Sequence, residues 1–354
     1  MLTLEGNLEK IRLIHLGLGG WGGNWAVHVL PDHPDVETVA YVDQSAERRQ
    51  EFASRLNLPT DRFFATLDAA AAGVVADAVS IAVPVALHEP LARHALELDK
   101  HVILEKPFAA TMVEARGLIA LAEARRKILA ISQNYRFYPA PRAIAELARH
   151  GYFGAIVGAK IDFRRNAFAE RSVNLNVDNP MLGDMAVHHF DLLRMLIGAD
   201  PLEVNARSWN PPGSPYRQDP AAAVVLTFPN AVTVSYRGNW VDAGPQTAWA
   251  GEWQLDFERA SVIWTSRGEQ PGSTRRDSVQ IRRPNATAPD DVPLPPLPLH
   301  DRAGMLAAFA ETVRTGSPPG DFPLAHLNLG TLATSHAALR SAANHGAPMR
   351  LADL

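Results

Sequence analysis

The chain has 354 residues and a formal net charge of -4 at pH 7, from 34 Lys and Arg against 38 Asp and Glu. This near balance excludes the broad basic surface that nucleic acids or anionic membranes require, so we expect a small-molecule ligand. Hydrophobic residues make up 47% and charged residues 20%, a composition typical of a globular protein, and the length allows two domains. The absence of cysteine excludes disulfides, thiolate metal sites and thiol nucleophiles.

The sequence gives no sign of export or of a membrane span. Four charged residues fall within the first twelve positions, where a signal peptide has a basic region followed by an apolar one. Of the two long uncharged stretches, 13–31 holds five glycines and 220–236 is interrupted by Pro229-Asn230, a pair typical of a hairpin turn. We therefore expect a cytoplasmic protein with neither a membrane nor a nucleic-acid partner.

From residue 11 to about 135, short apolar runs alternate with helical stretches, as in parallel strands joined by crossover helices. Strands are expected at 11–16, 36–42, 77–83, 101–104 and 128–132. Thr111, with Glu114 three residues later, forms a capping box that begins a helix running to about residue 126. The pattern predicts an α/β fold in which residues 1–135 form a domain with a doubly wound parallel sheet.

After residue 150 the pattern changes to longer β-rich runs separated by tight turns. These runs are typical of an antiparallel meander and cover 155–168, 202–209, 222–240 and 252–266. Residues 268–298 are rich in Pro, Arg, Asp and Ser, so we expect mostly loop there beyond a short run at 278–283. Helical periodicity returns at 303–315 and 324–344. We assign residues 136–354 to a second α/β domain.

A glycine-rich run, Gly17-Leu18-Gly19-Gly20-Trp21-Gly22, directly follows the first expected strand and begins a helix. Gly17 would make the tight turn, Gly19 would let the backbone approach a pyrophosphate, and Gly22 would allow close packing of the helix. The pyrophosphate of a dinucleotide would then lie at the helix N-terminus. The alternative interpretation is an ordinary turn between a strand and a helix.

Asp43 ends the second expected strand, about twenty residues beyond the last glycine of the run. A carboxylate at this place can accept hydrogen bonds from the adenosine ribose hydroxyls. It favours NAD over NADP, because it would repel a 2′-phosphate. Arg48 and Arg49 keep NADP as the alternative, since either guanidinium can reach a phosphate, although both also suit a solvated helix face.

Lys106 follows a buried strand within the sequence Glu105-Lys106-Pro107. Ligands of open α/β sheets bind beyond the carboxyl ends of the strands, so this lysine is expected beside a nicotinamide. Its ammonium group can stabilise a developing alkoxide or take part in proton transfer. Glu105 offers a local counter-charge, and Pro107 fixes the backbone. The alternative is a lysine that only serves solubility at a strand end.

The segment 183–196 predicts an amphipathic helix on which Asp184, His188 and Asp191 share one face. Two carboxylates beside a histidine would raise its basicity and create a proton acceptor near neutral pH. His189 points about a quarter turn away and is expected to be a packing residue. A solvated polar face and a metal site are the alternatives, but nothing else in the chain has a metal-binding pattern.

Together these motifs resemble the Gfo/Idh/MocA oxidoreductases, the relatives of glucose–fructose oxidoreductase and inositol 2-dehydrogenase. Two further motifs support the resemblance, Val83-Pro84 with His88 after the fourth strand and the run 133–137 that contains Asn134. The resemblance implies a Rossmann domain followed by an α/β domain with a large, mostly antiparallel open sheet. In such relatives that sheet often packs against a neighbouring subunit, so we expect a homo-oligomer, a dimer or a tetramer. Relatives commonly have a cis peptide bond at the position of Lys106-Pro107.

The resemblance implies catalytic roles for Lys106, Asp184 and His188. The cofactor-binding residues expected from the motifs and the resemblance are Gly17, Gly19, Gly20, Trp21, Gly22, Asp43, Val83, Pro84, His88, Glu105, Lys106 and Asn134. The expected substrate-binding residues are Lys106, Arg164, Asp184, His188 and Asp191. Further pocket candidates, with sheet packing or exposed surface as the alternative for each, are Arg165, Asn166, Trp240 and Trp249. The chain departs from many relatives at Ala186, where they have glycine, so substrate identity does not transfer.

We therefore expect a dehydrogenase that uses NAD, with NADP as the less favoured cofactor, to oxidise a secondary hydroxyl of a sugar, an inositol or a related polyol. His188 would take the proton while Lys106 holds the oxyanion, although the sequence does not decide which of the two is the base. The alternatives are a non-catalytic regulator that binds nucleotide or sugar, and a metal-dependent hydrolase that uses Asp184, His188 and Asp191.

Overall fold

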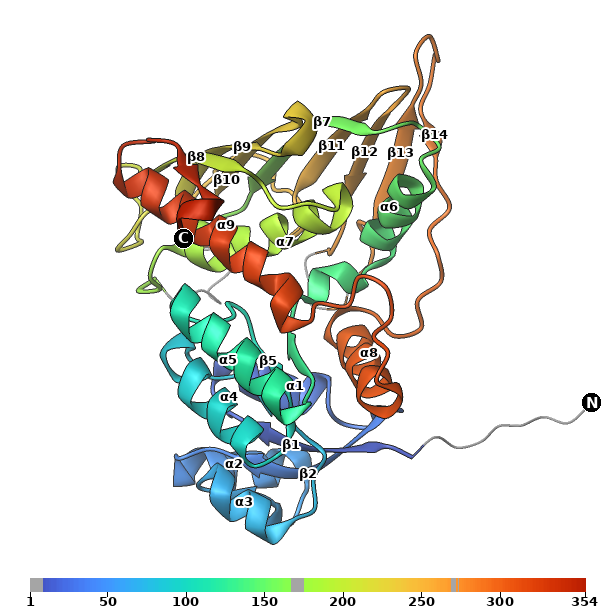
Figure 1. The fold of residues 1–354 in the computed structure, drawn as a ribbon. Coiled ribbons are helices and arrows are strands. Elements are labelled where there is room, and N and C mark those ends of the chain that lie inside the picture. Colours follow the sequence, from blue (N-terminus) through green and yellow to red (C-terminus); the bar gives the residue numbers. More distant parts are fainter. Residues whose placement is uncertain (1–8, 167–174, 269–271, 273) are drawn as a thin grey trace, which may run out of the picture. The chain divides into compact units, whose positions relative to one another are not determined.

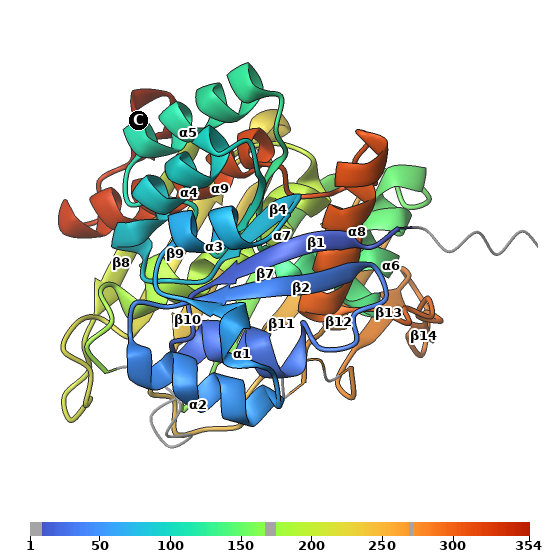
Figure 2. The same ribbon diagram turned by 90° about the horizontal axis from the view of Figure 1, so that it is seen from below.

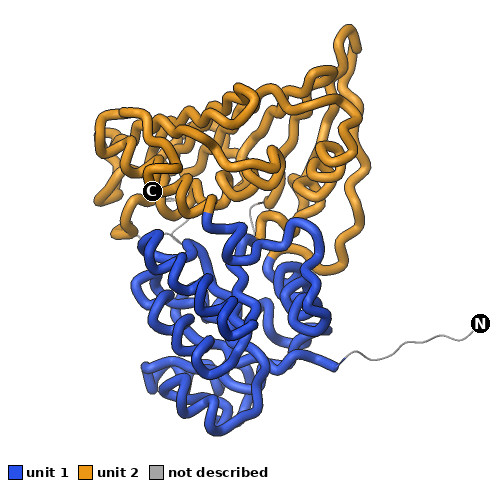
Figure 3. The backbone as a smooth tube through the Cα atoms, in the orientation of Figure 1, with its two compact units in different colours: residues 1–133, 302–329 blue, residues 134–301, 330–354 orange. Residues whose placement is uncertain are grey.

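The computed structural model of the chain describes residues 9–166, 175–268, 272 and 274–354. The chain divides into two compact units (Figure 3). Unit 1 contains the residues up to Gln133 together with Arg302–Leu329, and unit 2 contains Asn134–Asp301 and Gly330–Leu354. The break expected at residue 135 lies two residues from the observed one. The expected second domain, however, included residues 302–329, which belong to unit 1.

The return of residues 302–329 to unit 1 rests on specific contacts of helix α8 (Asp301–Thr315) and the segment after it. Arg314 Nη2 donates to Asp35 Oδ1 at 2.6 Å, and the ring Nε2 of His33 lies 3.1 Å from the carbonyl oxygen of Ala303. Further along, the backbone N–H of Ile131 donates to the carbonyl of Pro323 at 3.0 Å. Helical periodicity indicates that a helix has an apolar face, but it does not identify the partner of that face.

Unit 1 is built on a six-stranded sheet in which every strand pair is parallel, with the order β3-β2-β1-β4-β5-β6. The strands are β1 (Ile11–Leu16), β2 (Val36–Val42), β3 (Phe63–Phe64), β4 (Ala78–Ile81), β5 (His101–Leu104) and β6 (Leu129–Ile131). The helices between them are α1 (Gly20–His28), α2 (Ala46–Leu56), α3 (Leu67–Gly73), α4 (His88–Glu97) and α5 (Met112–Arg125). Figure 2 shows α1 and α2 on one face of the sheet and α3, α4 and α5 on the other. This doubly wound arrangement confirms the predicted fold class.

The predicted strands of unit 1 all exist, and three of them have the predicted bounds. They were recognisable because both faces of the sheet are covered, so that Leu13, Val79 and Leu104 are buried in continuous apolar runs. The capping box also forms, since Thr111 Oγ1 accepts the backbone N–H of Glu114 while the Glu114 carboxylate accepts that of Thr111. Strand β3 was missed because two residues are too few to show a period.

Unit 2 contains a nine-stranded sheet in its described residues, with the order β14-β13-β12-β11-β7-β10-β9-β8-β15. The strands are β7 (Ile156–Arg164), β8 (Glu203–Trp209), β9 (Ala221–Thr227), β10 (Thr233–Asn239), β11 (Glu252–Phe257), β12 (Ser261–Thr265), β13 (Ser278–Arg282), β14 (Asp290–Asp291) and β15 (Met349–Arg350). Only the central pair β7 and β10 is parallel among these, so the sheet is mostly antiparallel, as predicted.

One face of this sheet carries the core of unit 2. Ala159, Ile161 and Phe163 of β7 are buried in a cluster with residues of α6 (Pro139–His150) and α7 (Ala186–Ile197). Figure 1 shows these helices on one side of the sheet, together with α9 (Ala325–Ala343). The alternate residues of the central strands, such as Lys160 and Val225, are exposed on the other face. Among the helices of the described residues, none has the length and apolar character needed to cross a membrane.

Candidate functional site

The glycine run forms the turn between β1 and α1 in unit 1. Gly17 has φ +105°, and a Cβ atom there would collide with the carbonyl oxygen of Ala82. A Cβ at Gly22 would collide with the carbonyl oxygen of Gly17. At Gly20, by contrast, a Cβ would meet no described atom within 4 Å, and at Gly19 it would meet only the guanidinium of Arg48, at 3.6 Å. The turn is therefore tight on its inner side and open at the start of α1, which fits a pyrophosphate held by backbone N–H groups.

Asp43 follows β2 and is held by backbone donors of unit 1. Its Oδ2 accepts the N–H of Leu18 at 2.8 Å, and its Oδ1 accepts that of Ser45 at 2.9 Å. Each carboxylate oxygen can accept a second hydrogen bond, so ribose hydroxyls remain suitable partners. Arg49 is directed to backbone carbonyls, donating to that of Asp43 at 2.7 Å, while Arg48 lies 3.8 Å from the Asp43 carboxylate. The fixed carboxylate is the charge that a 2′-phosphate would meet first.

Glu105, at the carboxyl end of β5, links the strand to the glycine turn. Its Oε1 accepts the indole N–H of Trp21 at 2.9 Å and that of Trp25 at 2.8 Å. Its Oε2 accepts the backbone N–H of Lys106 at 3.1 Å. The carboxylate therefore fixes the backbone from which the lysine side chain begins. Trp25 was missed in the sequence, although its spacing of four from Trp21 puts both indoles on one face of α1.

Arg302, near the start of α8, completes this cluster in unit 1. Its guanidinium carbon lies 4.4 Å from the ring centre of Trp21 and 5.6 Å from that of Trp25, and Nη2 donates to Asn24 Oδ1 at 2.6 Å. Stacking of a guanidinium on indole faces is attractive. No local pattern in the sequence identified Arg302, because its partners are about 280 positions away along the chain.

His88 connects the loops that follow β4 and β5. One ring nitrogen, Nδ1, lies 2.8 Å from the carbonyl oxygen of Pro107, and Nε2 lies 2.9 Å from that of Val83. Burial lowers the pKa of His88, while the two carbonyl acceptors act in the opposite direction. The peptide bond between Lys106 and Pro107 is cis, as in the relatives that the sequence resembles. His88 thus positions the backbone beside Lys106, while cofactor contacts of His88, Val83 and Pro84 stay predictions.

In unit 2 the helical segment that carries Asp184 is not a continuous α-helix. Residues Pro180–Met185 form a π-helical turn, and α7 begins only at Ala186. The expected continuous α-helix over 183–196 therefore begins with a wider turn that carries Asp184, while the shared face of Asp184 and His188 stays a prediction. Turns of this kind are frequent at functional sites. His189 is a packing residue as expected, fully buried with Nδ1 3.1 Å from the Tyr236 hydroxyl.

His188 is buried and stacks on Tyr135. The two ring centres are 4.2 Å apart and the planes differ by 5°. The hydroxyl of Tyr135 accepts a hydrogen bond from Arg267 Nη1 at 2.9 Å. Burial raises the pKa of Tyr135 to about 12, with the charges of Asp301 and Asp184 adding to the effect of burial. The phenol therefore stays protonated at neutral pH and holds the plane of the histidine ring.

The structure does not support a substrate-binding role for Asp191. Its Oδ2 accepts from Arg136 Nε at 2.6 Å and its Oδ1 accepts from Arg136 Nη2 at 2.7 Å. Thr331 Oγ1 donates to Oδ1 at 3.1 Å, and the residue is 1% exposed. Both oxygens of the Asp191 carboxylate accept hydrogen bonds from the guanidinium of Arg136. Asp191 therefore positions the segment around Tyr135. The same contacts make Asp191 unsuitable as a ligand of the alternative metal site. The described residues contain no group of three His, Asp or Glu that could hold a metal ion.

Arg164 lies on the face of the sheet opposite to α7. It forms ion pairs with Glu252 at 2.8 Å and Asp162 at 3.3 Å, and strand alternation directs its side chain away from Phe163. The structure therefore does not bring Arg164 to His188, contrary to expectation, because successive strand residues point to opposite faces. Its neighbour Arg165 is buried instead, with its guanidinium carbon 4.6 Å from the ring centre of Trp249.

Asn134 begins unit 2 and donates through Nδ2 to Asp301 Oδ1. The two residues are buried and stand where the chain passes from one unit to the other in sequence. A cofactor contact of Asn134 stays a prediction.

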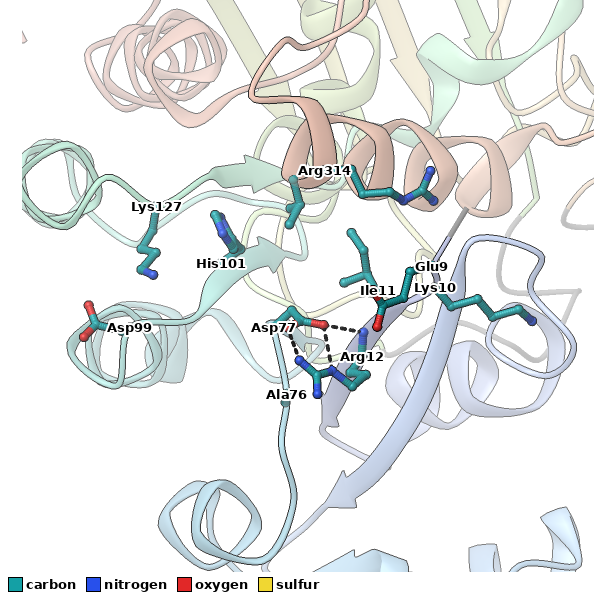
Figure 4. A pocket seen from close by; sticks show the side chains of 11 residues that line it. Glu9, Lys10, Ile11, Arg12, Ala76, Asp77, Asp99, His101, Lys127 and Arg314 are labelled. Atoms are coloured by element: carbon teal, nitrogen blue, oxygen red, sulfur yellow. Dashed lines mark hydrogen bonds and ion pairs between the residues drawn. The ribbon is translucent and has the colours of Figure 1, made fainter. Parts of the chain in front are cut away.

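A cavity of about 380 Å³ lies at the amino-terminal ends of β1 and β4 in unit 1 (Figure 4). Two of its polar pairs are already formed, since Arg12 Nη2 donates to Asp77 Oδ1 at 2.7 Å and His101 Nδ1 accepts the N–H of Ile128 at 2.9 Å. Open α/β sheets bind their ligands at the opposite edge, so this cavity is not the candidate site.

Comparisons with known proteins agree with this geometry. A family model described as an oxidoreductase family with an NAD-binding Rossmann fold matches residues 11–133, and the GFO/IDH/MocA C-terminal domain matches residues 142–263. An uncharacterized protein of Sinorhizobium fredii is 30% identical over 267 residues, which are 72% of this chain and 73% of that protein.

Two named proteins are also similar. The dTDP-3,4-didehydro-2,6-dideoxy-alpha-D-glucose 3-reductase of Streptomyces violaceoruber is 28% identical over 321 residues, 87% of this chain and 88% of that enzyme. An oxidoreductase of Agrobacterium radiobacter, solved with NAD+, L-tartaric acid and magnesium, superimposes with a TM-score of 0.83, covering 98% of this chain and 99% of that one at 19% identity. The structural likeness supports the fold.

Proposed function

Since the chain belongs to the Gfo/Idh/MocA family of sugar and polyol oxidoreductases and carries their NAD-binding Rossmann fold, we propose that it transfers hydride between NAD and a secondary hydroxyl of a sugar, an inositol or a related polyol. The observation that carries the proposal is Glu105, fixed by two indoles at the end of β5, where it holds the backbone of Lys106. The carboxyl ends of parallel strands are where such sheets act on their ligands.

The residues supply position, charge and proton transfer. When bound, the dinucleotide accepts or returns the hydride. Lys106 Nζ stabilises the oxyanion that develops on the substrate, and a ring nitrogen of His188 takes the hydroxyl proton. The ring of His188 keeps its orientation because it stacks on Tyr135. In this proposal Asp184 orients His188 or Lys106. Lys106 and His188 can exchange the roles of base and oxyanion partner, and the pH dependence of kcat/KM for each variant distinguishes them.

Asp43 supports NAD as the cofactor. Its carboxylate is fixed by two backbone N–H groups, so it cannot turn away from a 2′-phosphate without losing both hydrogen bonds. Of the two arginines that could bind a phosphate, Arg49 donates to backbone carbonyls and Arg48 lies 3.8 Å from the Asp43 carboxylate. We expect a lower KM for NAD+ than for NADP+ with the same substrate, and the reverse preference would contradict this assignment.

The test is turnover of a panel of sugars and polyols, followed through the absorbance of NADH at saturating NAD+. Lys106→Ala and His188→Ala should each lower kcat about 100-fold or more, because each removes a group that acts in proton transfer or charge stabilisation. If either variant keeps activity within a few-fold of the wild type, the site assignment is wrong. A chain that binds NAD+ but turns over no compound would fit the regulator alternative.

We also propose that the chain forms a homo-oligomer through the exposed face of the nine-stranded sheet. Val225 is 44% exposed there, in a strand whose other face is buried. Light scattering should give a dimer or a tetramer, and Val225→Glu should shift the mass toward the monomer. A monomeric wild type at micromolar concentration would contradict the proposal.

A further inference from the structure

Unit 2 holds a buried guanidinium whose described contacts are with neutral groups. Arg267, just after β12, is 7% exposed. Its guanidinium carbon lies 4.8 Å from the ring centre of Tyr135 and 5.3 Å from that of Trp249, and Nη1 donates to the Tyr135 hydroxyl at 2.9 Å. Its Nε is buried and has no hydrogen-bond partner among the described residues. Arg136 in the same unit differs, because its guanidinium donates two hydrogen bonds to the carboxylate of Asp191.

Asp277 and Asp301 act on Arg267, but their carboxylates form hydrogen bonds with other donors as well. Asp277 Oδ1 accepts the backbone N–H of Arg267 at 2.9 Å, while its Oδ2 accepts the Ser266 hydroxyl at 2.8 Å. Asp301 accepts the side-chain amide of Asn134. No ion pair within the described part of unit 2 includes Arg267. The negative charge of Asp301 favours the charged form of Arg267 and contributes to its raised pKa, but it does so without an ion pair. A buried guanidinium that lacks a direct ionic contact still gains from a ligand group of opposite charge.

The aromatic groups around Arg267 do not supply that charge. Burial raises the pKa of Tyr135 to about 12 and raises that of Tyr138 as well, so both phenols remain neutral at physiological pH. A second guanidinium, that of Arg165, lies over the same indole of Trp249 at 4.6 Å. The aromatic cluster therefore gathers two positive charges around Tyr135 and Trp249.

This cluster adjoins the proposed proton-transfer residue. Tyr135 stacks on His188 with 4.2 Å between ring centres, and Arg267 lies 4.8 Å from the same tyrosine ring, so the guanidinium carbon is at most about 9 Å from the imidazole centre. A sugar ring with one exocyclic group can span such a distance. A negatively charged group on the substrate would then meet Arg267 while a ring hydroxyl meets His188.

We propose that Arg267, with Arg165 beside it, binds an oxyanion of the substrate, either a carboxylate or a phosphate, so that the preferred substrate is an acidic sugar derivative rather than a neutral polyol. The inference rests on the proposed function, since it assigns the substrate class of the same site. The planar fork of a guanidinium matches both oxyanions, and the aromatic faces fix its orientation.

Matched substrates test the inference separately from the proposed function. D-Glucose is the neutral parent, D-glucuronate adds a carboxylate, and glucose 6-phosphate and UDP-glucose add phosphate at different places. We expect kcat/KM with NAD+ to be at least tenfold higher for one acidic derivative than for glucose. The acidic derivative with the highest kcat/KM identifies the oxyanion as a carboxylate or a phosphate. If glucose or myo-inositol is the best substrate, the inference fails while the proposed function stands.

Substitutions at Arg267 provide the second test. Arg267→Gln should raise KM for the acidic substrate at least tenfold while leaving the Kd for NAD+, measured by calorimetry, within twofold. The KM of Arg267→Lys for the acidic substrate should lie between those of Arg267→Gln and the wild type, because lysine keeps the charge but lacks the planar pair of N–H donors. Arg237→Gln removes an exposed guanidinium of β10 as a matched control and should change neither value. Equal losses for neutral and acidic substrates would show a structural role and overturn the inference.

A binding measurement keeps the test valid if Arg267→Gln does not fold or if no substrate is turned over. Inorganic phosphate should bind the wild-type chain in calorimetry and compete with the acidic substrate, and Arg267→Lys should weaken that binding several-fold. If the wild type binds NAD+ normally but does not bind phosphate, the inference is overturned. The proposal that the chain uses NAD would still stand.

Discussion

The two units differ in how their buried charged groups are satisfied. In unit 1, Asp43 is held by two backbone N–H groups and Glu105 by two indoles and a backbone N–H. In unit 2, Asp191 and Arg136 satisfy each other, but the guanidinium of Arg267 lies between aromatic rings and forms no ion pair among the described residues. Both units stack a buried guanidinium on aromatic rings, Arg302 on Trp21 in unit 1 and Arg267 on Tyr135 in unit 2, but we assign a ligand only to the one in unit 2, which adjoins His188.

The difference follows from what each unit must recognise. A dinucleotide always presents the same pyrophosphate and ribose groups, so backbone donors and a glycine turn serve for it, and these leave a pattern in the sequence. A substrate varies between relatives of one fold, so its partners are side chains from segments far apart in the chain. The predictions below test how complete each unit is, beginning with the largest effect.

Asp191→Asn should destabilise the protein by about 3 to 5 kcal/mol, because it leaves the guanidinium of Arg136 buried with an incomplete partner. The free energy of unfolding, measured with urea, checks this. Glu146→Gln, which breaks an exposed ion pair with Arg149, is the control and should cost about 0 to 1 kcal/mol. A variant with normal stability and a raised substrate KM would restore the substrate-binding role that the sequence suggested.

Gly17→Ala should weaken NAD+ binding about 100-fold, or about 2.7 kcal/mol, because φ +105° is strained for alanine and its Cβ would collide with the Ala82 carbonyl. Calorimetry with NAD+ measures the loss. Gly320→Ala, also in unit 1, places a Cβ where no described atom lies within 4 Å and should bind NAD+ normally. Equal NAD+ binding by both variants would show that the glycine turn does not shape the nucleotide-binding site.

Glu105→Gln should cost about 2 kcal/mol of stability and lower kcat, because an amide oxygen and nitrogen cannot both accept the donors that now meet two carboxylate oxygens. Thermal unfolding and steady-state kinetics measure the two effects. Trp25→Phe removes one of these donors and should have a smaller effect on both. If Glu105→Gln left kcat unchanged, the link from the indoles to Lys106 would have no part in activity.

Acidification should weaken both units through their buried histidines, and His15 and His189 have the largest effect. Burial lowers the pKa of His15 in unit 1 and of His189 in unit 2 to about 4. The unfolded chain takes up these protons near pH 6.5 while the folded chain does not, so stability falls as the pH falls below 6.5. Each histidine should account for about 1 kcal/mol between pH 7 and pH 5.5.

Urea unfolding at several pH values measures this dependence. His189→Gln and His15→Gln should each reduce the loss of stability between pH 7 and pH 5.5 by about 1 kcal/mol. A wild-type profile that is flat between pH 7 and pH 5.5 would contradict the assignment of neutral buried rings.

The sequence was informative where structure follows from local pattern. Strands buried on both faces, the capping box at Thr111 and the glycine turn all depend on residues close together in the chain, and the structure confirms them. The ion pair of Asp191 could not be predicted, because its partner Arg136 is 55 positions away and no spacing rule connects them. The same reason hid Arg267.

Two other errors concern packing rather than pattern. Helix α8 was assigned to the second domain because its periodicity shows only that one face is apolar. The π turn before α7 was read as α-helix because a single wider turn leaves the periodicity of the following residues intact. In each case the deciding contact is tertiary.

The pair of indoles on Glu105 also makes unit 1 its own optical sensor. Trp21 is 40% exposed beside the open end of the glycine turn, whereas Trp25 is buried and shares the same carboxylate. An indole emits at about the wavelength that reduced nicotinamide absorbs. Binding of NADH to unit 1 should therefore quench the fluorescence of Trp21 by energy transfer to the cofactor. Binding and release can then be followed in real time without a label, and independently of any substrate.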